Sequence, residues 1–197
     1  MACMDGTTFD FTTHIRRICA DMIARLPELQ HIRLEQVIIT FRQARKRVNH
    51  GLFATLTPLR FPGGSLEGFQ HGRRYRIHRM VDRQGREMLY ILSFYLPRFM
   101  DLTFEEKLVT ILHELWHISP TFDGDLRRHA GRCYAHSHSQ QQYDAHMALL
   151  AERWLRQNPA TEIYDFLQLN FGQLRRHRGA VCGLQLRQPK LLPVKHT

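Results

Sequence analysis

The chain has 197 residues, of which 43% are hydrophobic and 23% charged, and its formal net charge is +10. This length suits one domain with its own hydrophobic core, so we expect a single domain over residues 1–197. No run of about eighteen apolar residues occurs, which excludes a membrane-spanning helix. Met1–Asp10 lacks the basic and apolar regions of a secretory signal, so we expect a cytoplasmic protein.

Cysteines are widely scattered along the chain and form no C-x-x-C pair. There are four of them, Cys3, Cys19, Cys133 and Cys182. This spacing argues against a zinc ribbon and against a scaffold held by disulfides. We therefore expect reduced thiols with a structural role, as is usual in the cytosol.

Basic residues are concentrated in two stretches. One is Arg42–Arg47, and the other is a basic C-terminal tail, about residues 173–197, in a region with no acidic residue after Asp165. Lys and Arg side chains displace counterions from phosphate groups, so this tail predicts contact with nucleic acid. The alternative is a basic surface that only keeps the protein soluble.

In chain order, the first predicted element is an amphipathic helix over residues 12–26, which Pro27 ends. The β-branched run Val37–Phe41 predicts a strand, and residues 52–59 predict a second one before a Gly- and Pro-containing loop. Arg74–Asp82 and Arg86–Tyr95 predict a hairpin whose second arm is apolar enough to be buried in a sheet.

The second half of the chain is predicted to be helical. Thr103 and Glu106 form a capping box, so a helix is expected over about residues 103–118. Further helices are predicted near residues 139–157 and from Thr161, before the less regular basic tail. The order of elements indicates an α+β domain with a small, mostly antiparallel sheet.

The motif His113-Glu114-Leu115-Trp116-His117 lies on the predicted helix 103–118 and carries the chemistry. Residues four apart share one helix face, so the two imidazoles can reach a single zinc ion. Glu114 lies one step round the helix, where it can accept a proton from a metal-bound water without ligating the ion. The motif therefore predicts a zinc-dependent hydrolase that cleaves a peptide bond.

A catalytic zinc normally has three protein ligands and one position for water, so a further ligand is expected beyond the helix. We favour His129, because the eleven-residue loop between His117 and His129 can turn back at Asp123-Gly124. The alternatives are His136, His138, Asp123 and Asp125.

Three side chains of the predicted helix 139–157 are candidates for supporting roles. Asp144 could orient a metal-bound imidazole, and Tyr143 could stabilise an oxyanion. The alternative is core packing for Tyr143 and an exposed position for Asp144. Glu152 stands at a separation from His117 where some zinc peptidases place a glutamate ligand, but next to Arg153 we expect a surface position.

The segment from His113 to His129 resembles the phage-type metallopeptidases, a zincin-like family. In that family an H-E-L-x-H helix is followed by a short loop and a further histidine, which matches His129. The resemblance implies a zincin-like fold, zinc bound by His113, His117 and His129, and Glu114 as the general base. The chain lacks the H-E-x-x-H-x-x-G-x-x-H pattern of metzincins, because residues 121–123 occupy the stretch that ends in the last histidine of that pattern.

Our first hypothesis is accordingly a zinc metallopeptidase that acts on a peptide or protein substrate, with no membrane partner. Two alternatives stay open. One is a SprT-like, nucleic-acid-associated metalloprotease, although the paired cysteines of many such proteins are absent. The other is a non-catalytic zinc protein with a closed four-ligand site, for example one that recruits Cys133 or His136 beside His129.

Overall fold

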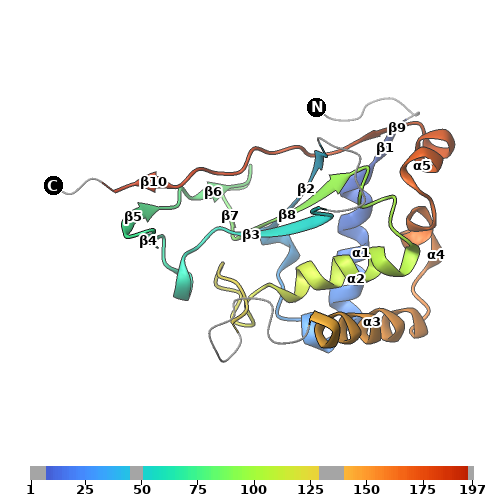
Figure 1. Ribbon diagram of the computed structural model, residues 1–197, viewed down its shortest axis with the longest axis horizontal. Coiled ribbons are helices and arrows are strands. Elements are labelled where there is room, and N and C mark those ends of the chain that lie inside the picture. Colours follow the sequence, from blue (N-terminus) through green and yellow to red (C-terminus); the bar gives the residue numbers. More distant parts are fainter. Residues whose placement is uncertain (1–7, 45–50, 129–139, 195–197) are drawn as a thin grey trace.

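The computed structural model describes residues 8–44, 51–128 and 140–194, and its centre is a three-stranded sheet of order β2-β8-β3 (Figure 1). These strands are β2 (Val37–Gln43), β3 (Ala54–Pro58) and β8 (Tyr90–Leu96). β8 runs parallel to β2 and antiparallel to β3, so the central sheet is mixed rather than mostly antiparallel. The α+β class is confirmed.

Alternation along the strands divides the sheet into two faces. In β2 and β8, Val37, Ile39, Tyr90 and Leu92 belong to the main core, whereas Ile38 and Ile91 belong to a small second cluster. Side chains of a strand alternate between its faces, so the two clusters lie on opposite sides of the sheet.

Two helices cover the main-core face, α1 (Phe11–Arg25) and α2 (Phe104–Trp116) (Figure 1). Both were predicted from sequence to within about two residues at each end. Asp10 caps α1 by accepting a hydrogen bond from the Thr13 backbone N–H at 2.9 Å. α3 (Gln140–Arg156) packs on the side of α2 away from the sheet, and α4 (Thr161–Tyr164) follows it (Figure 1).

The predicted hairpin over residues 74–95 is only partly correct. β5 (Arg73–Arg76) pairs with β4 (Glu67–Gln70), and the hairpin around residues 83–85 consists of the two-residue strands β6 (Met80–Val81) and β7 (Glu87–Met88). The residues after Met88 leave this hairpin because their apolar side chains fill the centre of the main sheet as β8.

Three of the C-terminal basic residues, Arg175, Arg176 and Arg178, lie in a helix. α5 (Phe171–Arg178) precedes β9 (Ala180–Cys182), which pairs parallel with β1 (Thr8–Asp10), and β10 (Leu192–Pro193) adds a third strand to β4-β5. Between β9 and β10 the chain is extended, and its Leu184 carbonyl accepts the Phe41 N–H at 3.0 Å. Contact with nucleic acid through these residues stays a prediction.

Two further expectations concern thiols and membranes. Cys19 is a free, fully buried thiol, whereas Cys182 is disulfide-bonded, so the expectation of reduced cysteines is wrong for Cys182. Cys3 and Cys133 lie outside the described residues. No helix in the described part of the chain is long and apolar enough to cross a membrane.

Candidate active site

The helix α2 presents the H-E-x-x-H motif at its C-terminal end. The predicted capping box fixes its start: the Thr103 hydroxyl accepts the Glu106 N–H at 3.2 Å, and the Glu106 carboxylate accepts the Thr103 N–H at 2.8 Å. His113 and Glu114 follow in the last turn, and His117 is the C-terminal cap. The H-E-x-x-H residues therefore stand on a helix whose start is fixed ten residues before His113.

The imidazoles of His113 and His117 converge. Their Nε2 atoms lie 2.9 Å apart and their ring centroids 4.5 Å apart. Two nitrogen ligands placed about 2.0–2.1 Å from a tetrahedral zinc ion stand about 3.4 Å apart. A small side-chain rotation therefore brings the two rings to the spacing that one zinc ion requires. The two imidazole nitrogens thus fit a zinc ion as ligands.

Glu114 is buried beside the edge of the sheet, with 8% of its surface exposed. Burial raises the pKa of its carboxyl to about 7, and a hydrogen bond from the Leu56 backbone N–H opposes that rise. The Phe53 carbonyl accepts the Tyr95 N–H of β8, and the Leu59 N–H donates to the Leu89 carbonyl just before β8. Residues that bond to the neighbouring strand alternate with residues that do not, so the Leu56 N–H, three residues from both, points away from β8. In the metal-free protein, burial therefore holds the pKa of this carboxyl near neutrality.

The loop after α2 returns to the helix, as predicted. Gly124 adopts a φ of 88°, and Ile118 pairs with Leu126 in an antiparallel bridge. The buried Tyr90 hydroxyl donates to the Asp125 carbonyl at 2.9 Å and accepts the Gly124 N–H at 3.0 Å. The Arg127 N–H donates to the His117 carbonyl at 2.7 Å, so the chain runs beside the motif just before residue 129.

The structure describes some of the candidate metal ligands and not others. His113 and His117 come together, whereas His129, His136 and His138 lie outside the described residues. Asp123 accepts the Asp125 N–H, and the Asp125 carboxylate accepts bonds from Gly63, Leu126 and Arg128. These two aspartates hold the loop together. No group of three metal-ligating side chains occurs among the described residues.

Tyr143 lies at the motif. Its ring centroid is 4.8 Å from that of His113 and 6.0 Å from that of His117. Burial, and then the charge of Glu114, raises the pKa of the Tyr143 hydroxyl. The structure therefore brings this tyrosine to the site.

The other candidates on α3 lie at different depths. Asp144 is half-buried and lines a cavity with His113, so the expectation of an exposed position is wrong. His146 is exposed and its ring packs against Trp116 at 4.9 Å. Glu152 is exposed and pairs with Arg156, as expected.

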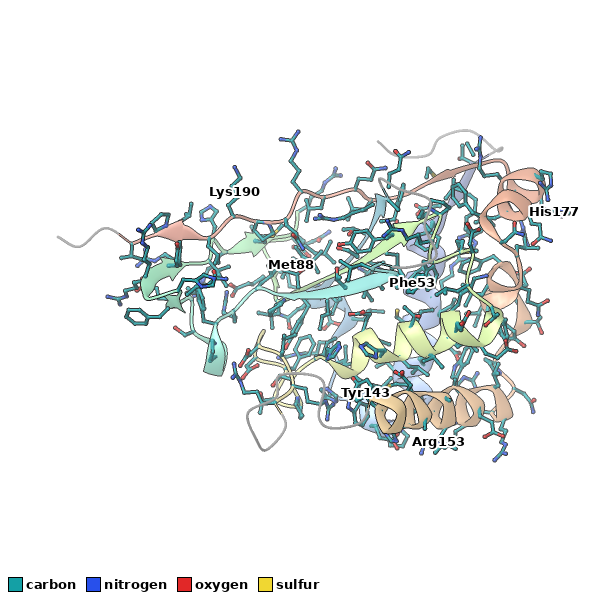
Figure 2. The ribbon with its side chains drawn as sticks, viewed as in Figure 1. Phe53, Met88, Tyr143, Arg153, His177 and Lys190 are labelled. Atoms are coloured by element: carbon teal, nitrogen blue, oxygen red, sulfur yellow. The ribbon has the colours of Figure 1, made fainter. Side chains whose placement is uncertain are left out.

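A cavity of about 740 Å³ opens beside His113 and Glu114. It is bounded by the start of β3, by α2 and by the first turns of α3. In Figure 2, Phe53 on the sheet side and Tyr143 on α3 are seen on either side of α2. Sequence reasoning missed this cavity and the Leu56 amide, because both bring the β3 segment next to residues about fifty or more positions later in the chain.

The chain matches a family model. The family described as "Putative phage metallopeptidase" matches residues 9–151, which include β2, β3, β8, α2 and most of α3. No curated protein and no solved structure matches the chain.

Proposed function

Since the chain belongs to the phage metallopeptidase family, which implies a hydrolase with a metal cofactor, we propose that it is a zinc peptidase with a zincin-like site. The observation that carries this proposal is the convergence of the His113 and His117 Nε2 atoms at 2.9 Å, one residue from the buried Glu114 carboxyl. His129 is the proposed third ligand.

Neutral imidazole nitrogens are the donors that zinc prefers in such sites, and His113 and His117 supply two of them. When bound, zinc polarises a carbonyl group and lowers the pKa of a water molecule. The third donor enters from the residues after Arg128, and the bond from the Arg127 N–H to the His117 carbonyl supports this, because it holds the chain next to the motif.

Glu114 is the proposed general base. It accepts a proton from the attacking water and passes it to the nitrogen of the leaving amine, so the proton removed from water ends on the product. The Leu56 N–H holds the carboxyl in place. Cavity space beside Glu114 leaves room for the substrate, which favours an enzyme over a closed structural zinc site.

Tyr143 has a positioning role in this proposal. Its ring contacts both imidazoles from α3 and restricts their orientation. Metal-ligating histidines depend on such neighbours, because a rotated ring no longer directs its nitrogen at the ion.

Elemental analysis of the purified protein tests the metal site. We expect about one zinc per wild-type chain, and loss of that zinc in His113→Ala and in His129→Ala. His146→Ala is the matched control, since this histidine lies three residues after Tyr143 on α3 but packs on Trp116. Zinc retained in His129→Ala would move the third ligand to another residue, and a zinc-loaded, folded wild type is a precondition for any peptidase assay.

A further inference from the structure

The cavity beside the candidate site extends along α2. His113 and Glu114 border it at one end, and Glu105 and Glu106, in the first turn of the helix, border it at the other. An α-helix rises about 1.5 Å per residue, so the cavity follows α2 for roughly 12 Å. An extended peptide advances about 3.3 Å per residue, so this length accommodates three or four substrate residues on one side of the cleaved bond.

The walls of the cavity are apolar with acidic groups among them. Phe53, Leu102, Val109, Ala145 and Ala148 supply apolar surface, and carboxylates come from Glu105, Glu106 and Asp144. No lysine or arginine is among the described residues that line the cavity. Long aliphatic side chains that end in a cation match both properties, because the stem packs on apolar surface while the charged end reaches a carboxylate.

The carboxylates of this cavity differ in their partners within the described part of the chain. Glu105 and Asp144 take part in no ion pair there. Glu106 accepts the Thr103 N–H, and its charge also acts on the neighbouring Lys107 ammonium. Arg98 lies at the Gly51 end, where its guanidinium faces the backbone and donates to the Leu52 carbonyl at 3.5 Å. Asp144 is half-buried, so water and salt screen its attraction for a cation less than that of the exposed Glu105 and Glu106.

The acidic cavity contrasts with the rest of the molecule. The chain as a whole carries a formal net charge of +10, which repels basic peptides. The carboxylates beside the motif oppose this repulsion where a basic side chain enters the cavity.

We propose that the cavity along α2 selects lysine and arginine side chains within three or four residues of the cleaved bond, on one side of that bond only. This inference rests on the proposed peptidase function. Asp144 recognises the basic side chain nearest to the motif, and Glu105 and Glu106 recognise one further along the extended substrate.

Binding tests the inference independently of catalysis. The probe is a fluorescently labelled octapeptide with lysine at alternate positions, compared with the same peptide carrying glutamine, and the protein is the zinc-loaded Glu114→Gln variant. We expect at least about tenfold tighter binding of the lysine peptide. This preference should disappear when Glu105→Lys and Asp144→Lys are added, but persist with the control pair Glu152→Lys and Glu162→Lys, which are exposed and outside the cavity.

Equal affinity for the two peptides, or an equal loss in the control pair, would overturn the inference. The milder pair Glu105→Gln and Asp144→Asn serves if the charge reversals prevent folding, which circular dichroism reports.

Cleavage separates this inference from the proposed function. A diverse peptide mixture is digested by the zinc-loaded wild type, and mass spectrometry identifies the cleaved bonds. We expect lysine and arginine to be enriched on one side of the bonds that the wild type cleaves. This enrichment should be absent for the variant with both Glu105→Lys and Asp144→Lys. Glu114-dependent cleavage without such enrichment would support the peptidase function and contradict the proposed specificity. Preferential binding of the lysine peptide without any cleavage would support the basic-peptide site and contradict the peptidase function.

Discussion

Glu114 and Lys107 are seven residues apart on α2 and both are nearly inaccessible, with 8% and 1% of their surfaces exposed. Burial shifts both pKa values toward the neutral form, raising that of Glu114 to about 7 and lowering that of Lys107 to about 8. Their surroundings differ. The Lys107 ammonium donates to the Leu167 and Leu169 carbonyls at 2.8 and 2.9 Å, whereas Glu114 borders a cavity beside two converging imidazoles.

The difference shows how a perturbed ionisable group is to be interpreted. A shifted pKa is shared by catalytic groups and by structural ones, so it does not identify a site on its own. Lys107 is enclosed by acceptors and joins α2 to the segment after α4, which is a structural role. Glu114 combines its shift with access to space and with neighbouring metal-ligand candidates, and this combination indicates chemistry.

Replacing Glu114 should have the largest effect on activity. Glu114→Gln removes the proton acceptor but keeps the size of the side chain, so we expect peptide hydrolysis to fall by roughly 10²–10⁴-fold. Zinc content and folding should be unchanged, because neither imidazole is altered. The measurement is kcat/KM on a peptide found to be cleaved by the wild type, with metal analysis of both proteins. Unchanged hydrolysis in this variant would exclude Glu114 as the base.

Replacing Lys107 should instead affect stability. Lys107→Met leaves two buried carbonyls without their donor, so we expect the free energy of unfolding to fall by about 1–3 kcal/mol. The exposed Lys190→Met is the matched control and should change it by less than about 0.5 kcal/mol. Urea unfolding measures both. A loss of kcat/KM in folded Lys107→Met without a loss of stability would contradict the structural role.

Local sequence rules predicted the Glu114 half of this comparison well. The capping box at Thr103, the apolar stripe and the H-E-x-x-H spacing all lie within fifteen residues, so short-range physics was sufficient. The same rules missed the burial of Lys107, because its acceptors come from residues about sixty positions later. A lysine next to the apolar stripe is usually exposed, and only the tertiary contact overrides that expectation.

The sheet and the C-terminal part show the same limit. The sequence pattern located β2, β3 and β8 as strands but not their pairing, since pairing of β8 with β2 and β3 is set by long-range packing. α5 was missed although Asn170 and Gln173 form a capping box, a signal that the sequence does contain. The disulfide at Cys182 had no local signal, because pairing depends on residues distant in the chain.

The pH dependence of stability gives the finest test of the comparison, in the metal-free protein. The folded-state pKa of Glu114 is raised from 4.5 to about 7, so the folded state holds more protons between these values and its stability falls as the pH rises through them. The folded-state pKa of Lys107 is lowered from 10.5 to about 8, so the unfolded state holds more protons in that range and stability rises with pH. The total change in the free energy of unfolding over each pH range should amount to about 1–3 kcal/mol.

The two slopes are separated by variants that do not titrate. The difference in unfolding free energy between wild type and Glu114→Gln should decrease from about pH 4.5 to about pH 7, and that between wild type and Lys107→Met should increase from about pH 8 to about pH 10.5. Urea unfolding at half-unit pH steps measures both. Flat differences would mean that water reaches these groups and that burial does not govern them. Zinc should remove the Glu114 slope and leave that of Lys107, because a bound cation favours the carboxylate and lowers its pKa.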